Sequence, residues 1–250
     1  MELKFLGRGA AFNPIEGGNS AFFTNDETLF LIDCGEGAFS KLFELKVLGV
    51  EQKIKRIKLF LTHTHSDHAG GIGTLAAYSF FKMGVPLEIV LPENAAYRKS
   101  IETLMSIFGS PKEQYRILSC EDLDNYYESF RSVRYLETSH CDQLLSFSLL
   151  FETNEGRVFY SGDTNETRHI ERLISERTTH RIDSIYVDFT TADFAGNVHL
   201  SCRRLESAVP KELRGCVYCM HFGDGKEELS TARNAGFNVV EVSKRDAPLI

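Results

Sequence analysis

The sequence predicts an α/β protein, because short apolar runs typical of buried strands alternate with stretches of helical periodicity. Residues 57–61 form an apolar run suited to a buried strand, and residues 70–81 read as a glycine-containing turn that leads into a helix. Residues 93–108 show helical periodicity, whereas residues 143–151 and 156–160 read as two strands joined by a turn.

Length and composition indicate a globular chain without a membrane anchor. Nothing in the 250 residues resembles a linker, so we expect a single domain over residues 1–250. Residues 1–7 read as a first strand, too short for the apolar region of a secretory leader, and no apolar run approaches membrane length. The six scattered cysteines fit a reducing cytoplasm better than a disulfide framework. We therefore expect a cytoplasmic protein with no membrane partner.

The segment directly after the strand predicted at residues 57–61 carries the densest set of metal-ligating side chains: His63, His65, Asp67 and His68. A strand-to-helix loop lets the first two histidines point to one metal while Asp67 and His68 turn to a second. Imidazole and carboxylate suit zinc, and also iron or manganese. The alternative is a histidine-rich surface loop without metal, which the crowding of three of the eight histidines beside an aspartate disfavours.

Three further candidate ligands, His140, Asp163 and His221, each end a strand-like run. Gly162 allows a sharp turn immediately before the carboxylate of Asp163. Taken singly, His140 or His221 is equally compatible with an ordinary structural histidine. Cys141, beside His140, also comes near the expected site.

Together these motifs resemble the metallo-β-lactamase superfamily over nearly the whole chain. The matching segments are residues 31–37, the HxHxDH block at 63–68, His140, residues 161–164 and His221. The resemblance implies an α/β fold, an αββα sandwich of two mixed β-sheets flanked by helices, with the metals at one edge between the sheets.

The resemblance also implies a role for each candidate. His63, His65 and His140 would hold one divalent ion, Asp67, His68 and His221 would hold a second, and Asp163 would bridge both. Two ions are implied, with zinc as the expected metal, and Asp67 is also counted with the catalytic residues. Asp33 fits a buried position that orients the first loop.

Within the superfamily, the chain looks like the phosphodiesterase branch that contains the tRNA 3′-end processing endonucleases (tRNase Z). The similarity lies in residues 3–12, 33–37 and 187–191, followed by His199. In that branch an acidic residue holds the corresponding histidine, which protonates the leaving oxygen. Here Asp188 replaces the usual glutamate. Without the resemblance, His199 would read as a polar loop histidine.

Two departures favour a small substrate. The bacterial tRNA-processing enzymes usually carry a long basic arm between the positions of His140 and Asp163, and this chain has room only for two strands and a turn. Residues 222–224 also depart from the serine-arginine context usual after the last histidine. A formal charge of −7 suits a small phosphodiester better than a long polyanion, which is held largely by Lys and Arg.

The compact form looks more like the anti-Pycsar enzymes. We therefore expect a metal-dependent phosphodiesterase that hydrolyses cyclic mononucleotides such as cCMP, cUMP, cAMP and cGMP to nucleoside monophosphates and counters Pycsar anti-phage signalling. A small cyclic nucleotide is the expected partner, without a stable nucleic-acid partner.

The tyrosine-rich middle of the chain has two interpretations. Tyr115, Tyr126, Tyr127 and Phe130 are candidates for stacking on a nucleobase, although clustered aromatic residues more often pack in a core. The same segment is a candidate for a cap over the site or for the contact of the homodimer that we expect.

Other functions stay open at this point. A tRNA 3′-end processing endonuclease is the main alternative, and the missing arm counts against it. A lactonase or thioesterase would share the ligands. A metal-binding redox protein, such as a di-iron carrier, would usually place a carboxylate at the position of His65.

Overall fold

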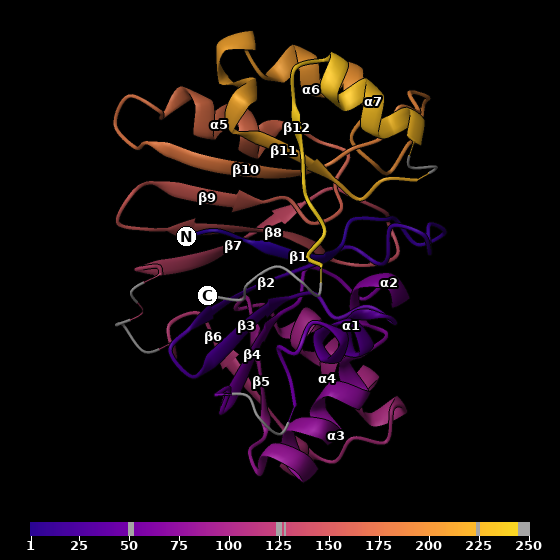
Figure 1. Ribbon diagram of the computed structural model, residues 1–250, viewed down its shortest axis with the longest axis vertical. Helices are drawn as coiled ribbons and strands as arrows, with labels where there is room; N and C mark the ends of the chain where they lie inside the picture. The colour runs from indigo at the N-terminus through magenta and orange to yellow at the C-terminus, as the bar shows by residue number, and fades with distance from the viewer. Residues whose placement is uncertain (50–52, 124–126, 128, 224–225, 245–250) are drawn as a thin grey trace.

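Two β-sheets packed face to face form the centre of the molecule (Figure 1). The computed structural model describes residues 1–49, 53–123, 127, 129–223 and 226–244. Within these residues each sheet has six strands, in the order β1-β2-β3-β4-β5-β6 and β12-β11-β10-β9-β8-β7.

The first sheet and its helices come from the first half of the chain. Their elements are β1 (Lys4–Gly7), β2 (Ser20–Asn25), β3 (Thr28–Ile32), α1 (Ala38–Glu44), β4 (Arg56–Phe60), α2 (Ser66–Ala69), α3 (Ile72–Met83), β5 (Leu87–Leu91), α4 (Ala95–Ile107), the 3-10 helix η1 (Lys112–Gln114) and β6 (Tyr115–Ser119).

The second half of the chain supplies the second sheet and its helices. Their elements are β7 (Ser132–Thr138), β8 (Ser146–Glu152), β9 (Arg157–Tyr160), α5 (Arg168–Ser175), β10 (Ile182–Asp188), α6 (Cys202–Ala208), η2 (Lys211–Cys216), β11 (Val217–Met220), α7 (Lys226–Asn234) and β12 (Asn238–Val239).

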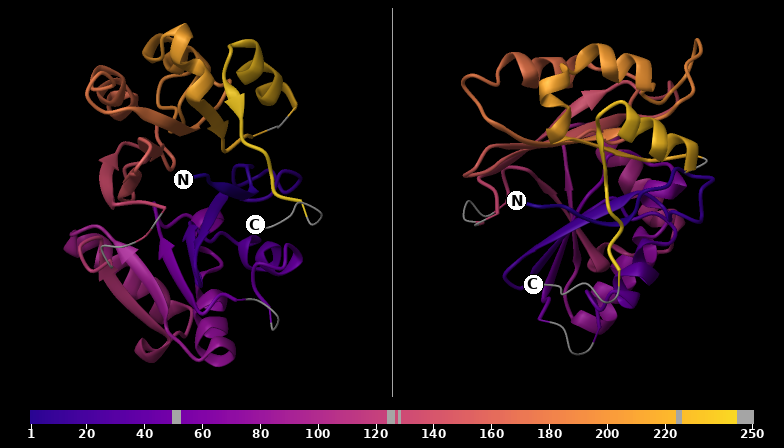
Figure 2. Two further views of the ribbon diagram at one scale, coloured as in Figure 1. Left: turned by 60° about the vertical axis from the view of Figure 1, so that its left-hand side comes forward. Right: turned by 45° about the horizontal axis from the view of Figure 1, so that its top comes forward.

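Helices cover the outer face of each sheet. Helices α1, α3 and α4 lie against the first sheet, and α5, α6 and α7 lie against the second (Figures 1 and 2). This order of layers confirms the predicted αββα sandwich of two mixed sheets.

Both sheets are built on the same plan. Strands β1 to β3 pair antiparallel and strands β3 to β6 pair parallel. In the second sheet β7 to β9 pair antiparallel and β9 to β12 pair parallel. The parallel strands of a sheet end at a common edge, so the loops that follow them are brought together there.

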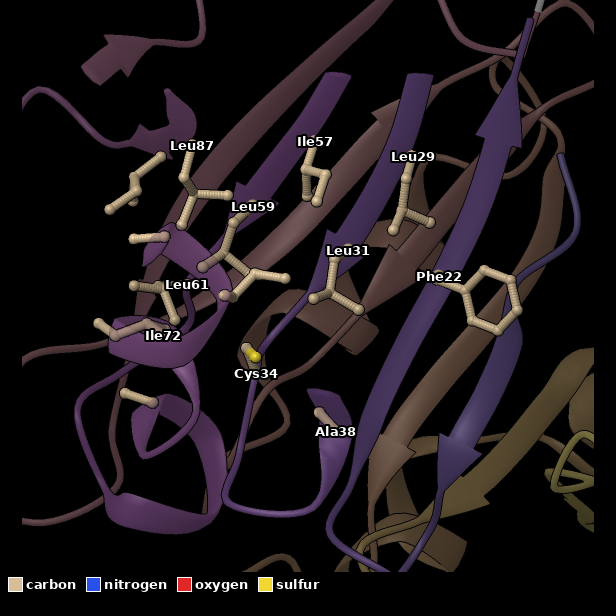
Figure 3. Close-up of a cluster of buried hydrophobic side chains, with 14 of the residues drawn as sticks. Phe22, Leu29, Leu31, Cys34, Ala38, Ile57, Leu59, Leu61, Ile72 and Leu87 are labelled. Carbon is tan, nitrogen blue, oxygen red and sulfur yellow. The ribbon is translucent and has the colours of Figure 1, made fainter. Parts of the chain in front are cut away.

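The side chains of the central strands divide between two cores. On β3, Leu29 and Leu31 face the helices, whereas Phe30 and Ile32 face the other sheet, because successive strand residues point to opposite faces. Figure 3 shows the helix-side core, where Leu29 and Leu31 lie beside Leu59 of β4. The strands are thus apolar on both faces, as expected for parallel strands covered on both sides.

The core between the sheets is rich in aromatic rings. Phe23 stacks on Phe30 with ring centroids 4.8 Å apart, and Phe130 meets both rings edge-on. Tyr127 also packs edge-on against Phe30, and Tyr115 is buried in the helix-side core.

Packing is therefore the role of the described members of the tyrosine-rich segment, and the alternative of base stacking is not supported for Tyr115, Tyr127 or Phe130. Tyr126 lies outside the described residues. The segment also contains β6, a strand that the sequence analysis did not predict.

Most predicted elements are confirmed with small shifts. The strand predicted at residues 57–61 is β4, the helix predicted at 93–108 is α4, and the two strands between His140 and Asp163 are β8 and β9. The ligand segment differs in one respect, since Asp67 and His68 lie on the short helix α2 instead of in an irregular loop. Among the described residues, every helix falls short of the length and apolarity that crossing a bilayer requires.

The helix-side core predicts a clear effect of truncation on stability. Leu59 is fully buried beneath the helices, so Leu59→Ala should lower the free energy of unfolding by ~2–5 kcal/mol in urea denaturation. Arg56→Ala, on the exposed first residue of the same strand, should change it by less than about 0.5 kcal/mol. Equal effects of the two substitutions would contradict this account of the core.

Candidate metal centre

The candidate ligands meet at the edge where the strands of both sheets end. His63, His65, Asp67 and His68 follow β4 of the first sheet. His140 follows β7, Asp163 follows β9, and His221 follows β11 of the second sheet. The structure therefore brings together all seven side chains that the sequence analysis named as ligands.

A buried aspartate fixes the first ligand segment. Asp33 accepts hydrogen bonds from Thr62 N–H at 2.8 Å and from the Thr62 hydroxyl at 2.9 Å. His68 Nδ1 lies 2.8 Å from the same carboxylate and donates to it. Burial raises the pKa of Asp33, although His68 and Thr62 oppose this shift. Asp33 thus connects both ends of the segment, in the orienting place expected from the sequence.

Two glycines allow the backbone to pass close to the site. A Cβ on Gly35 would lie 1.9 Å from the carbonyl oxygen of Asp67, so no side chain fits there. Gly162 has a φ of 59°, and a Cβ on it would meet the carbonyl oxygen of Phe147 at 2.7 Å. This left-handed turn is the sharp bend predicted before Asp163.

The first cluster contains three imidazoles and one carboxylate. His65 Nδ1 lies 3.1 Å from His63 Nε2 and 3.2 Å from His140 Nε2. Asp163 Oδ2 lies 3.7 Å from His63 Nε2 and 3.8 Å from His140 Nε2.

The second cluster shares Asp163 with the first. His68 Nε2 and His221 Nε2 are 3.4 Å apart, and each lies 3.4 Å from Asp67 Oδ2. Asp163 Oδ1 is 3.2 Å from His68 Nε2, while Asp163 Oδ2 is 3.4 Å from His221 Nε2. Each cluster has the residue types and spacing of a metal site, with its ligand atoms all within 4.8 Å of one another.

Three of these histidines, His63, His68 and His140, have their remaining ring nitrogen engaged outside the clusters. His63 Nδ1 lies 3.0 Å from the Thr62 hydroxyl, and His140 Nδ1 donates to the carbonyl oxygen of Val198 at 2.9 Å. His68 Nδ1 donates to Asp33 in the same way. A histidine whose Nδ1 carries the proton turns the lone pair of Nε2 toward the cluster, as in metal-ligating histidines generally.

The clustered atoms fit divalent ions better than they fit hydrogen bonds to one another. His65 Nδ1 faces two ring nitrogens but carries at most one proton, so it cannot donate to both. Tetrahedral zinc with bonds of roughly 2.0–2.1 Å separates its ligand nitrogens by about 3.3 Å, close to the spacing observed. Asp163 Oδ1 is buried without a hydrogen-bond partner among the described residues, as a ligand atom would be.

In the first cluster, the protonation states of two imidazoles and of the shared carboxylate suit metal ligands. Burial lowers the pKa of His63 well below its ordinary value and lowers that of His65, so both rings are neutral with free lone pairs. Burial opposes ionisation of Asp163, but the surrounding imidazoles outweigh it and hold the pKa of Asp163 well below its usual range.

His199 and Asp188, which we call the acid pair, lie beside the clusters. His199 Nδ1 is 2.8 Å from Asp188 Oδ2, which also accepts the Thr164 N–H at 3.0 Å. The other oxygen, Asp188 Oδ1, lies 3.4 Å from His221 Nδ1. The carboxylate of Asp188 raises the pKa of His199. One buried aspartate therefore faces a candidate metal ligand and the candidate acid together.

Several site contacts were not predicted from the sequence. Glu166 accepts from Ser139 N–H at 2.9 Å and from the Thr138 hydroxyl at 3.0 Å, next to His140. Glu228 accepts hydrogen bonds from the loop that follows Asp188 and from the loop that follows His221. Neither glutamate stands in a recognisable motif, and nothing local distinguishes Glu228 from Glu227. Cys141 does approach the site, with its Sγ 3.8 Å from His65 Nε2.

Solved structures share this fold at low sequence identity. The metallo-β-lactamase fold protein YhfI from Bacillus subtilis superposes with a TM-score of 0.70 and 17% identity, covering 97% of this chain and 95% of that one. Human tRNase Z, short form, gives a TM-score of 0.63 and 21% identity, with 97% of each chain covered. These similarities show that the chain has the metallo-β-lactamase fold.

Sequence comparisons identify the family. A protein from Saccharibacillus brassicae named Anti-Pycsar protein Apyc1 is 30% identical over 237 residues, which cover 92% of this chain and 93% of that protein. A protein of the same name from Bacillus phage 010DV004 is 28% identical, with 92% of each chain covered. The model of the family described as Anti-Pycsar protein Apyc1 matches residues 1–244. The family match and the two His/Asp clusters together support a metal-dependent hydrolase, as the sequence predicted. The chain therefore belongs to the Anti-Pycsar protein Apyc1 family.

Proposed function

We propose that the protein is a dinuclear metal-dependent phosphodiesterase that opens cyclic mononucleotides to nucleoside monophosphates and thereby counters Pycsar signalling. The observation that carries the proposal is the carboxylate of Asp163, which belongs to both ligand clusters and lies 4.0 Å from the ring of His199. The name of the relatives, Anti-Pycsar protein, supports the biological role.

In this proposal each cluster holds one divalent ion, with zinc as the expected metal. His63, His65 and His140 would hold the first ion, Asp67, His68 and His221 would hold the second, and Asp163 would serve both sites. When bound, the two ions supply an activated water near neutral pH and neutralise charge on the phosphoryl oxygens.

His199 is the proposed general acid. Its Nδ1 is held by Asp188, so the proton that it transfers is carried by Nε2. The reaction forms a bond from a water oxygen to phosphorus and breaks the bond from phosphorus to a ribose oxygen. That oxygen is a poor leaving group, and it takes the proton of His199 Nε2 as the bond breaks. Asp188 orients the ring and favours its protonated form.

The surroundings of the site favour a small substrate. The chain between His140 and Asp163 forms the hairpin of β8 and β9. All of its residues are described, and no arm extends from it. The net charge of −7 gives little general attraction for a long polyanion. A cyclic mononucleotide has a single phosphate charge, which the ions and His199 can match.

The six cysteines, all in the described part of the chain, form no disulfide, which fits the cytoplasmic location that is part of this proposal. The homodimer and the single domain expected from the sequence stay predictions.

Metal content is the first test. Elemental analysis of the purified protein should find two divalent ions per chain. His63→Ala or Asp163→Ala should abolish turnover while circular dichroism shows the fold retained, because each removes a ligand of the first cluster. His180→Ala, on an exposed histidine outside the clusters, is the matched control and should leave turnover unchanged. If either the His63→Ala or the Asp163→Ala variant turned over substrate at nearly the wild-type rate, the substituted residue would not be a metal ligand needed for the reaction.

The role of His199 is tested by changing the leaving group. His199→Ala should lower kcat on a cyclic mononucleotide by ~10²–10⁴-fold with metal content intact. A p-nitrophenyl phosphodiester, whose leaving group needs no proton, should lose much less. Equal losses on both substrates would show that His199 does not act as the acid.

The substrate class is tested by comparing the rates of hydrolysis of cyclic mononucleotides and of pre-tRNA. Cyclic mononucleotides should be hydrolysed far more efficiently than pre-tRNA is cut, and with little dependence on salt, because one bound phosphate releases few counterions. Preference for pre-tRNA, or a steep fall in rate with salt, would favour the tRNA-processing function instead. Base selectivity should be loose, because the described aromatic residues of the middle segment are packed in the cores.

A further inference from the structure

A buried glutamate on α7 joins the two loops that flank the acid pair. The side chain of Glu228 is 5% exposed. Its Oε2 accepts the Gly223 N–H at 2.5 Å, and its Oε1 accepts the Thr190 hydroxyl at 2.8 Å and the Thr191 N–H at 3.0 Å. One carboxylate thus satisfies donors from two separate segments of the chain.

Each of these segments carries site residues close by. Gly223 stands two positions after His221, and Thr190 stands two positions after Asp188. Thr190 is also paired with the segment that follows His199, because its N–H donates to the carbonyl oxygen of Leu200 at 3.0 Å. Through these hydrogen bonds Glu228 is connected to the backbone segments that carry Asp188, His199 and His221.

The backbone at His221 needs such support. Its φ of 63° lies in the left-handed region, which is unfavourable for a residue with a side chain. The next residue, Phe222, makes two hydrogen bonds with the loop that follows β1. Its N–H donates to the carbonyl oxygen of Arg8 at 2.8 Å, and its carbonyl oxygen accepts from Ala10 N–H at 2.9 Å. The bond from Gly223 N–H to Glu228 adds a third hydrogen bond to the same turn.

We propose that Glu228 is a positioning residue for the reaction, which fixes the turn of His221 relative to the loop of Asp188 and His199 and so sets the acid in line with the metal centre. This inference rests on the proposed function. All three partners donate to Glu228, and a neutral amide in its place could accept from only one loop while its NH₂ group faced a backbone N–H of the other, that of Gly223 or of Thr191. The link between the loops would then be lost although the side chain kept its size.

The alternative is that Glu228 only stabilises the start of α7, where acidic residues interact favourably with the helix dipole. Glu227 shares that position in the first turn but is exposed, and its side chain makes none of the hydrogen bonds found for the described residues. The pair therefore provides a matched comparison, in which E227Q removes the same charge from the same helix turn without disturbing the loops.

The test compares E228Q with E227Q in the metal-loaded protein. We expect E228Q to lower kcat on a cyclic mononucleotide by ~10–100-fold, since small misplacements of a catalytic group have effects of this size, with a much smaller change in KM and a smaller loss on a p-nitrophenyl phosphodiester. E227Q should match the wild type. In the double variant E228Q/H199A, the loss should be close to that of H199A alone, because the two residues act through one step.

Hydrogen–deuterium exchange provides a readout that does not depend on turnover. E228Q should speed the exchange of the amide of Gly223 or of Thr191, whichever faces the NH₂ group and loses its acceptor, and of the neighbouring amides of Thr190 and Cys202, because the loops are no longer linked. Catalysis and exchange like those of E227Q, or a lower melting temperature with kcat intact, would overturn the inference. The inference would also be overturned if the reduction in kcat of the double variant equalled the product of the reductions in the two single variants. If the wild type opened no phosphodiester, the proposed function would fail, while the exchange measurement would still decide whether Glu228 joins the loops.

Discussion

The buried carboxylate of Asp33 is the group on which the arrangement of the site depends. It is completely shielded from solvent and accepts hydrogen bonds from Thr62 and His68, at the two ends of the ligand segment. A polar group buried at this depth is tolerated only when it is fully hydrogen-bonded, so packing of β3 against β4 also fixes the donors. The candidate ligands between these two residues, His63, His65 and Asp67, are thereby held at the centre.

The two halves of the chain repeat one plan but use it for different purposes. In each half an aspartate follows the third strand: Asp33 follows β3, and Asp163 comes shortly after β9. The first aspartate contacts a candidate ligand, His68, from outside the centre, whereas the second lies inside it and belongs to both clusters. The repeat is not evident in the sequence, because a buried strand requires only apolar side chains and imposes no particular residues.

Local patterns explain what could be predicted from the sequence. The strand before His63, the helix α4 and the sharp turn at Gly162 each follow from a few neighbouring residues, and the seven ligand candidates stand at strand ends where chemistry is concentrated. Contacts between distant segments left no such pattern. Glu228 looks like any acidic residue at a helix start, and Phe130 looks like a candidate for base stacking until the sheets are packed and its ring lies against Phe23 and Phe30. Burial of this kind depends on the tertiary arrangement, which no window of sequence contains.

The clusters draw their side chains from both sheets, with four from the first half of the chain and the remainder from the second. Ions held by such a set would bind the packed sandwich and not the separated halves, so binding would be linked thermodynamically to the association of the sheets. At a free ion concentration 100-fold above the dissociation constant, this linkage would add about 2.7 kcal/mol per ion to the free energy of unfolding. The thermal stability of the chain would then report the availability of metal in its surroundings.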